Sequence, residues 1–387
     1  MRNILRKILK VLKWVGIVLA SIIVLFFLVR SIGRMVNNIT PKGGINETIY
    51  VDVNGQEMWI NIYGQDKNNP VLLYLHGGPG YSSSFADYKL LRKLSEDYTV
   101  VNWDQRSCGK TWLKNQDDTT PITLELMRSD IDVMTDYILE YLDKDKLTVM
   151  GISWGSFYAL DFAYNHPEKT ECCIGLSQAL GYYEGEPEYM YSSFVMQAEY
   201  LKVADFVSDE DKELAQKIDT DELVQFLVEA SLYGHSDRGG EGKSIFFQLK
   251  NKYKKELSAY MHEHGETDLI KDCDENMIAA ALFCPYYNIV ELYKANLVYS
   301  DECYNGLVFE MHTPGEDNCV LNRKEYQCPV YFFLAEDDLS CNPKMAEEYL
   351  NSITAPAKGI GYTTGGHEDT LLHSDELVKF IHENVLK

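Results

Sequence analysis

The segment GISWGS, Gly151 to Ser156, has the residue types and the spacing needed for nucleophilic catalysis by a serine. It fits the pattern G-x-S-x-G, which alone would arise by chance in a chain of this length about one time in ten. Its context is more specific, because the apolar stretch KLTVM precedes it and SFYALDFAYN follows it with helical spacing. A sharp strand-to-helix turn exposes the serine hydroxyl and leaves no room for a Cβ at the flanking glycines. The pattern therefore predicts Ser153 as a nucleophile.

A serine hydroxyl needs a neighbouring base, and in this arrangement its partners follow in the chain order serine, acid, histidine. His367 lies in TTGGHEDT, a loop after the last short strand, where two glycines allow the imidazole to approach the serine. We predict His367 as the general base, with His373 as the alternative. The other histidines fall at helix ends, in the helix-rich middle of the chain or in the loop that follows an earlier strand.

The acid that orients the histidine should follow the strand VYFFLA, where three carboxylates stand side by side. They are Glu336, Asp337 and Asp338. The alternation of side chains along a strand does not choose among them, so the residue pattern alone leaves all three open.

The stretch PVLLYLHGGPGYSSS, residues 70–84, joins an apolar strand to three glycines and a proline. Acyl transfer passes through an oxyanion, which preorganised backbone N–H groups stabilise by about 3 kcal/mol each. One donor is the residue after the nucleophile, Trp154, and the second comes from a loop after an earlier strand. Glycines let the backbone of HGGPG turn an N–H toward the substrate. We assign Gly78 as this donor, with Gly77 as the alternative, and His76 as a brace for the loop.

Strand and helix patterns alternate from residue 65 to about residue 180, which is typical of a parallel sheet covered by helices on both faces. A hairpin around Asn54-Gly55 precedes this region, and strand patterns return at CPVYFFLAEDD and KGIGYT. We expect an α/β core interrupted by a helical cap, with reactive groups at the carboxyl ends of the strands. The expected divisions are 1–42 for a basic tail and anchor, 43–180 and 321–387 for the core, and 181–320 for the cap.

The run WVGIVLASIIVLFFLV, Trp14 to Val29, contains sixteen residues without a charge. As a helix it extends roughly 24 Å, slightly less than a bilayer core of about 30 Å, and Lys13 and Arg30 can reach toward the interfaces. A cleaved signal peptide is the alternative, but its apolar region is usually shorter and ends in small residues. We predict an uncleaved, single-pass transmembrane helix. Five basic residues precede the span and three follow it, so we expect a cytoplasmic N-terminus and an extracytoplasmic body.

The body of the chain is strongly acidic. Residues 1–42 hold eight Lys or Arg and no acid, so the remainder carries 28 basic and 59 acidic side chains, a net charge of −31. Such a surface repels phosphates and argues against nucleic acid as a ligand. All nine cysteines lie beyond the anchor without a C-x-x-C pair, and we expect most of them to be buried free thiols.

Three motifs together resemble the proline iminopeptidase group of α/β-hydrolases: HGGPG at 76–80, WDQRSCGKT at 103–111 and GISWGS at 151–156. The resemblance covers about 47–180 and 325–387. It implies an α/β-hydrolase core and a serine peptidase that removes an amino-terminal residue, often proline, from short peptides without a metal or cofactor. In this group the acid closes a G-x-x-D turn, which maps onto Ala335-Glu336-Asp337-Asp338, with alanine in place of the glycine, and selects Asp338, with Asp337 second. The histidine loop of the group matches His367.

The resemblance also implies how the substrate is held, because members of the group bind the ammonium of the peptide through glutamates of the cap. The stretch YYEGEPEYMYSS offers Glu184, Glu186 and Glu188, with Glu199 further along. The residues do not choose among them, and we name Glu184 and Glu188 as candidates for substrate binding.

Two further positions also depart from the pattern of the group. Ser107 stands where the group has a glycine in the D-Q-R loop, and Ile152 replaces a glycine before the nucleophile. Neither belongs to the expected catalytic machinery, but a side chain at position 107 can reshape the wall of the pocket.

We therefore expect a membrane-anchored serine hydrolase, foremost an aminopeptidase that removes N-terminal residues from short peptides through an acyl-enzyme. An esterase or amidase for small apolar acyl groups is the first alternative, and an anchored binding protein without activity is the second. The expected partners are a short peptide or small acyl substrate and the lipid bilayer. The preferred residue and the oligomeric state are left open.

Overall fold

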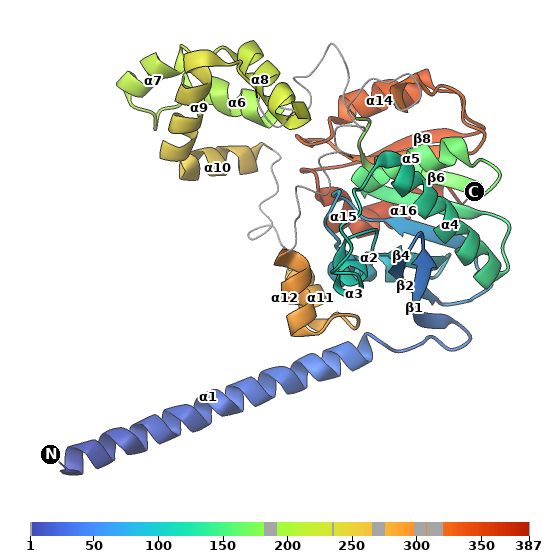
Figure 1. Ribbon diagram of the computed structural model, residues 1–387, viewed down its shortest axis with the longest axis horizontal. Coiled ribbons are helices and arrows are strands. Elements are labelled where there is room, and N and C mark those ends of the chain that lie inside the picture. The colour runs from blue at the N-terminus through green and yellow to red at the C-terminus, as the bar shows by residue number, and fades with distance from the viewer. Residues whose placement is uncertain are drawn as a thin grey trace.

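The strands join into one mixed sheet in the computed structural model, which describes residues 2–181, 192–233, 236–264, 275–297, 307 and 320–386 (Figure 1). Among these residues the sheet has eight strands in the order β1-β2-β4-β3-β5-β6-β7-β8. β1 and β2 pair antiparallel with their neighbours, and all pairs from β4 to β8 are parallel. The strands are β1 (Ile45–Val53), β2 (Gln56–Gly64), β3 (Val71–Leu75), β4 (Thr99–Trp103), β5 (Leu147–Ser153), β6 (Thr170–Gln178), β7 (Val330–Ala335) and β8 (Lys358–Thr363).

The hairpin predicted around Asn54-Gly55 is confirmed. β1 and β2 pair along their whole length, and the two turn residues have φ values of 47° and 83°, which asparagine and glycine adopt at little cost. In the fully buried β3, Leu73 and Leu75 pack on one side of the sheet, whereas Leu72 and Tyr74 pack on the other. The strand is apolar throughout because both faces are covered.

Helices cover both faces of the sheet, as the alternating pattern predicted. α4 (Leu124–Leu142), α5 (Trp154–Asn165) and α14 (Pro343–Ser352) pack on one face, and α2 (Ser84–Leu94) and α16 (Ser374–Asn384) pack on the other. Two short helices, α3 (Gly109–Lys114) and α15 (Asp369–Leu372), were not predicted from the sequence. They are too short to produce a recognisable period.

The described residues between β6 and the 3₁₀ turn at Val320–Asn322 are helical or loop. α6 to α10 pack around an apolar cluster of their own, whereas α11 and α12 lie near the end of α1 and against α2 and α3 (Figure 1). The boundaries at 180/181 and 320/321 remain predictions. The helices are α6 (Ser192–Leu201), α7 (Asp209–Ala215), α8 (Thr220–Tyr233), α9 (Gly240–Lys252), α10 (Lys254–Glu263), α11 (Glu275–Phe283) and α12 (Ile289–Leu297).

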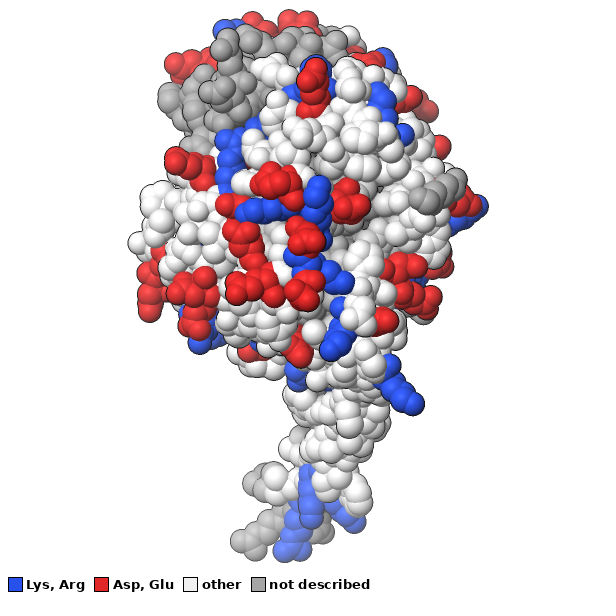
Figure 2. Space-filling model, turned by 90° about the vertical axis from the view of Figure 1, so that its right-hand side faces the viewer, with Lys and Arg blue, Asp and Glu red and all other residues white. Residues whose placement is uncertain are grey.

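The N-terminal segment forms one continuous helix, α1 (Arg2–Val36), which projects away from the body (Figure 1). Within Arg6–Val36 an 18-residue stretch has a mean hydropathy of 2.6, and only 6% of that stretch is buried. Figure 2 shows this projection as a largely uncharged surface with basic groups at its far end. By length and composition α1 can cross a membrane, and a signal sequence has the same properties.

The C-terminal turns of α1 bind the end of α11. Arg30, which is 5% exposed, donates to the Tyr287 carbonyl at 2.8 Å. Arg34 donates to the carbonyls of Cys284 at 3.1 Å and Pro285 at 2.9 Å. Cys284 directly follows α11, where a cation is favourable, and Pro285 and Tyr287 belong to the loop beyond it.

Candidate active site

Ser153 ends β5 in a strained backbone conformation, and α5 begins at the next residue. Its φ is 53° and its ψ is −124°, a region that residues with side chains rarely adopt. A Cβ at Gly151 would lie 2.0 Å from the carbonyl oxygen of Gly155, and a Cβ at Gly155 would lie 2.1 Å from that of Leu75. Only glycine fits at either position. β5 continues through Gly151 and Ile152 to Ser153.

Asp338 follows β7, His367 follows β8, and the two side chains meet. Nδ1 of His367 donates to Asp338 Oδ2 at 2.8 Å. The other carboxylate oxygen accepts the N–H groups of Ser340 and Cys341, both at 2.8 Å. The hydroxyl of Ser177, on β6, donates to the His367 carbonyl at 2.7 Å. Both the acid and the imidazole are therefore held in fixed orientations.

The structure distinguishes the three acids that follow β7. The side chains of Glu336 and Asp337 are exposed, whereas Asp338 is 3% exposed and contacts His367. The geometry therefore favours Asp338, the residue that the family resemblance selected.

His373, the alternative base, has a different environment. Its Nδ1 lies 2.5 Å from the Thr363 hydroxyl and its Nε2 lies 3.8 Å from Asp369. It lines the same cavity as Ser153. The imidazole that contacts Asp338 is that of His367, so the geometry favours His367 as the base.

The electrostatics around His367 suit a general base. Burial lowers the pKa of His367, but the charge of Asp338, the hydrogen bond to it and the charge of Glu368 outweigh burial, and the net effect raises the pKa. Because Nδ1 donates to Asp338, the neutral ring carries no proton on Nε2, which can accept one. The same carboxylate stabilises the imidazolium that forms.

Cys341 adds a thiol to this cluster. It forms a hydrogen bond with Ser153, and its sulfur, an Asp338 oxygen and a His367 nitrogen all lie within 4.8 Å of one another. Such atoms can bind zinc. However, burial and the charge of Asp338 raise the pKa of Cys341 well above its ordinary value, and Asp338 already accepts three hydrogen bonds. The protonated thiol and the three N–H groups bound to Asp338 therefore favour a hydrogen-bonded cluster over a metal centre.

The HGGPG loop follows β3 and passes beside Ser153. His76 is fully buried, its Nδ1 lies 2.7 Å from the Gly77 carbonyl oxygen, and its Nε2 accepts the N–H of Gln105 at 3.1 Å. Burial lowers the pKa of His76, so the ring is neutral and braces the loop as predicted. The C=O and N–H of a trans peptide point in opposite directions, so the Gly78 N–H points away from His76. Gly77 and Gly78 both line the cavity that Ser153 lines, and the choice of Gly78 as the oxyanion donor stays a prediction.

Gln105 connects the two halves of the expected oxyanion site. Its amide donates to the His76 carbonyl at 3.0 Å and accepts from the indole N–H of Trp154 at 2.9 Å. The backbone N–H of Trp154 stands at the first position of α5, where a helix offers no partner of its own. It is therefore suited to bind an anion formed at Ser153. Sequence reasoning missed this role of Gln105, although the residue lies in the WDQR motif.

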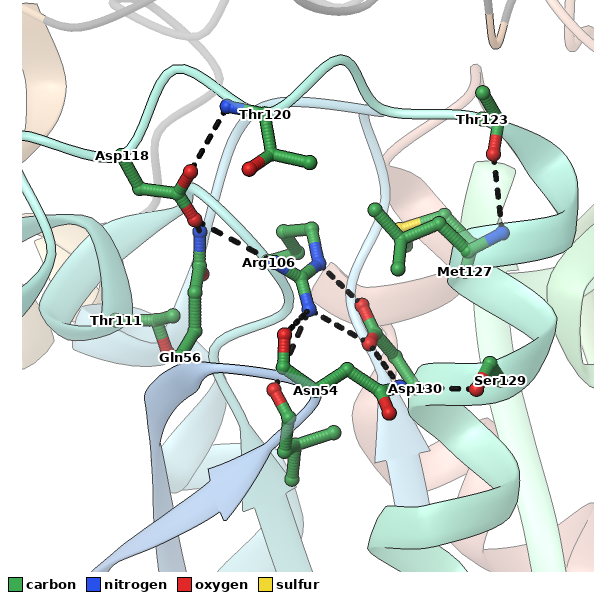
Figure 3. Close-up of polar contacts among 12 residues, drawn as sticks. Asn54, Gln56, Arg106, Thr111, Asp118, Thr120, Thr123, Met127, Ser129 and Asp130 are labelled. Carbon is green, nitrogen blue, oxygen red and sulfur yellow. Dashed lines mark hydrogen bonds and ion pairs between the residues drawn. The ribbon is translucent and has the colours of Figure 1, made fainter.

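Arg106 fixes the same loop to the hairpin and to α4 (Figure 3). It donates to both oxygens of Asp130, at 2.6 and 2.8 Å, and neither side chain is more than 1% exposed. It also donates to the carbonyls of Val53 and Asn54, each at 3.3 Å, and lies 3.6 Å from Asp118. A two-pronged pair of this kind defines orientation as well as distance.

A cavity of about 700 Å³ opens at Ser153, a size typical of small-molecule sites. Gly77, Gly78 and His367 line it together with Ser153. It is therefore the space in which a substrate carbonyl would meet the hydroxyl, the imidazole and the glycine loop. Apolar side chains from α2, α11 and α15 form much of the remaining wall: Phe85, Ala86, Leu90, Ala279, Ala280, Leu371 and Leu372.

Of the candidates for substrate binding, only Glu199 belongs to the described part of the chain, and it does not line this cavity. Glu184, Glu186 and Glu188 lie outside the described part of the chain. Glu199, on α6, has a side chain that is 54% exposed and pairs with Lys202 at 2.7 Å.

Sequence reasoning also missed Ser177 and Cys341, which contact His367 and Ser153 respectively. Neither stands in a motif, and only the three-dimensional arrangement reveals them. Six cysteines are described; all are free thiols and five are buried, as expected. With these positioning contacts, a hydroxyl, an imidazole–carboxylate pair and a glycine loop surround one cavity, an arrangement suited to acyl transfer.

Comparison with known proteins agrees with this chemistry. A family described as "alpha/beta hydrolase fold" matches residues 70–374. The chain is 27% identical over 201 residues to "Probable aminopeptidase YbaC" of Bacillus subtilis (strain 168), covering 51% of this chain and 63% of that protein. It is 26% identical over 133 residues to "Proline iminopeptidase" of Lactobacillus delbrueckii subsp. lactis, covering 34% and 43%. The matches thus span less than two thirds of these relatives.

Among solved structures, the chain is similar to a "putative lipase (lip1)" from Acinetobacter baumannii AYE. The TM-score is 0.52 at 14% identity, covering 92% of this chain and 94% of that one. At this identity the similarity concerns the fold alone.

Proposed function

Because this chain belongs to the α/β-hydrolase fold family, we propose that it is a serine hydrolase that removes N-terminal residues from short peptides. The observation that carries the proposal is the 2.8 Å hydrogen bond between Asp338 and His367, whose imidazole lines the cavity that Ser153 also lines. The relatives named as an aminopeptidase and a proline iminopeptidase support the peptidase specificity.

In the proposed reaction, Oγ of Ser153 attacks the carbonyl carbon of the first residue while Nε2 of His367 takes the hydroxyl proton. The negative charge moves to the carbonyl oxygen, where the N–H groups of Gly78 and Trp154 receive it. The C–N bond then breaks, and His367 gives its proton to the leaving amine. A water molecule, deprotonated by His367, hydrolyses the acyl-enzyme and regenerates the hydroxyl of Ser153.

Asp338 has two roles in this scheme. It holds Nδ1–H of His367, so that Nε2 is the nitrogen that faces the chemistry, and it stabilises the imidazolium after proton transfer. The N–H groups of Ser340 and Cys341 hold its carboxylate in a fixed orientation, and the side chain is only 3% exposed. Gln105 and His76 support the loop that carries Gly78, so that the donor is preorganised rather than recruited during the reaction.

We further propose that α1 anchors the enzyme in a membrane as a single span, with the N-terminus in the cytoplasm and the catalytic body outside. The length and hydropathy of α1 support a span, and the excess of Lys and Arg before it supports this orientation. Cysteine accessibility labelling from either side of sealed vesicles tests the orientation.

Labelling of the full-length protein by a fluorophosphonate probe tests the nucleophile. We expect labelling of the wild type and none of Ser153→Ala, with the same thermal unfolding for both, because one hydroxyl at a cavity contributes little to the core. As a control, Ser340→Ala, an exposed serine beyond β7, should label normally. Equal labelling of Ser153→Ala and wild type would exclude Ser153 as the nucleophile.

A substrate panel tests the reaction. Prolyl and alanyl arylamides should be cleaved, and blocking the free amine by acetylation should abolish cleavage. The apolar wall of the cavity favours one alternative, an esterase or amidase for small apolar acyl groups. Cleavage of acyl esters with no preference for a free amine would support that alternative and exclude the peptidase.

A further inference from the structure

Asp87, in the first turns of α2, is a buried carboxyl group that lines the cavity of Ser153 and His367. It is 6% exposed, and the hydroxyl of Ser83 donates to it. The hydroxyl of Tyr74 lies beside it without a well-formed hydrogen bond. Among the described residues, no lysine, arginine or histidine forms an ion pair with this group.

This environment is unusual among the buried aspartates of the described residues. Four of them pair with an arginine, a lysine or a histidine, and a fifth, Asp104, accepts from Ser82, Tyr287 and the Lys110 N–H. Asp87 has neither a cation nor such a set of donors. The four paired residues are Asp130, Asp161, Asp211 and Asp338.

A buried carboxylate without a cation is energetically costly. Burial, with a smaller contribution from the charge of Asp104, raises the pKa of Asp87 to about 7, although the neighbouring hydroxyls of Ser83 and Tyr74 oppose this rise. A carboxylate in the first turns of a helix also interacts favourably with the helix dipole, so the test must distinguish this structural role from a role in binding substrate. That role does not require the residue to line a substrate cavity.

We propose that Asp87 binds the ammonium group of the substrate and thereby selects substrates with a free amino terminus. This inference rests on the proposed function, because the amine of the substrate supplies the cationic partner that Asp87 lacks. Phe85 and Leu90 line the cavity close to it in the chain. Two lysines of α2, Lys89 and Lys93, also line the cavity, but Lys93 pairs with Asp375 and neither forms an ion pair with Asp87. An ammonium beside Asp87 would be partly desolvated and bound by the carboxylate. Asp87 is thus a specificity residue and takes no part in proton transfer.

Two esters that differ only in the amine test this proposal on the full-length protein at pH 7.5: alanyl p-nitrophenyl ester and propionyl p-nitrophenyl ester. Asp87→Asn should lower kcat/KM for the alanyl ester about 30-fold or more. For the propionyl ester it should change kcat/KM by less than about 3-fold. Asp97→Asn is a matched control outside the cavity, where the carboxylate pairs with His382 at 2.6 Å, and it should change neither rate.

Two outcomes would overturn the proposal. An equal loss for both esters means that Asp87 supports the structure of α2, and no loss for either means that the amine binds elsewhere. Fluorophosphonate labelling of Asp87→Asn at the wild-type rate shows that the triad is intact and separates these outcomes from a failure to fold.

A binding measurement keeps the inference testable if neither ester is hydrolysed. Calorimetry on Ser153→Ala should detect alaninamide but not propionamide, and adding Asp87→Asn should abolish alaninamide binding. If the wild type neither hydrolyses esters nor takes the fluorophosphonate, the proposed function fails while this binding result still decides the role of Asp87. Equal binding of the two amides, or binding of neither, would contradict the inference.

Discussion

Replacing Arg106 with methionine tests how the loop beside the active site is held. The arginine donates to both oxygens of Asp130, and both side chains are buried (Figure 3). Methionine fills similar volume but removes the cation, so Asp130 is left with Asn54 at 2.8 Å as its side-chain partner. Removing one member of a buried ion pair typically costs 3–5 kcal/mol, so we expect the free energy of unfolding to fall by about 4 kcal/mol.

The pH dependence gives this prediction a second signature. Burial raises the pKa of Asp130, and Arg106 opposes the rise, so its loss raises the folded-state pKa further above the unfolded value. Between those two pKa values the folded state holds a proton that the unfolded state has released, and stability therefore falls as pH rises. The deficit of Arg106→Met relative to wild type should be smaller at pH 5 than at pH 8.

Urea unfolding of the full-length protein in detergent, followed by tryptophan fluorescence, measures both effects. Lys344→Met is the matched control, because Lys344 and Glu348 form an exposed pair at 3.9 Å that should contribute well under 1 kcal/mol. The double variant Arg106→Met/Asp130→Leu removes both charges and should recover much of the loss. If Arg106→Met costs no more than Lys344→Met, the pair does not stabilise the loop and the reasoning is wrong.

Three further predictions concern the triad, the elbow and the anchor. The raised pKa of His367 means that kcat/KM should decline as pH falls through a midpoint above 6.5, because the protonated ring cannot act as a base. Asp338→Asn should lower that midpoint and reduce kcat by about 10⁴-fold. An unchanged midpoint in the pH–rate profile of this variant would argue against the pair. Gly155→Ala puts a Cβ 2.1 Å from the Leu75 carbonyl oxygen and should cost about 1–3 kcal/mol in urea unfolding, whereas Gly16→Ala, with no atom within 4 Å, should be neutral. Arg34→Ala removes the hydrogen bonds that hold the end of α11, whose Ala279 and Ala280 line the cavity, and should raise KM several-fold without slowing fluorophosphonate labelling. Arg6→Ala, at an exposed position near the other end of α1, should leave KM unchanged. Equal KM values for the wild type and both variants would contradict a role for α1 in shaping the cavity.

The elements that could be predicted are those whose signal is local. β3 is a continuous apolar run, and β5 is largely apolar up to Met150. The close approach of Gly155 to Leu75 requires the glycine that makes the G-x-S-x-G pattern visible. His367 could be selected by chain order and by the glycines before it. The acid could not be selected by pattern alone, because Asp337 and Asp338 differ only in burial, which depends on the turn that brings the N–H groups of residues 340 and 341 to one carboxylate.

Contacts between distant segments left no such signal. Tyr287 donates to Asp104 at 2.6 Å across 183 residues, and Arg30 binds the carbonyl of the same tyrosine across 257 residues. A tyrosine in a helix-rich segment and an arginine beside an apolar run are each explained by local roles, as a core residue and as a membrane-interface residue. The second role for each emerges only when α1 and α11 pack together.

These distant contacts form a continuous path from the anchor to the glycine loop. Arg30 holds the backbone of Tyr287, the Tyr287 hydroxyl binds Asp104, and the next residue, Gln105, binds His76 through both its backbone N–H and its side chain. His76 in turn contacts the Gly77 carbonyl and so sets the direction of the adjoining N–H. The helix that can cross a membrane is therefore part of the framework that aims the expected oxyanion donor, which is why changes in α1 should be felt in the cavity and not only in localisation.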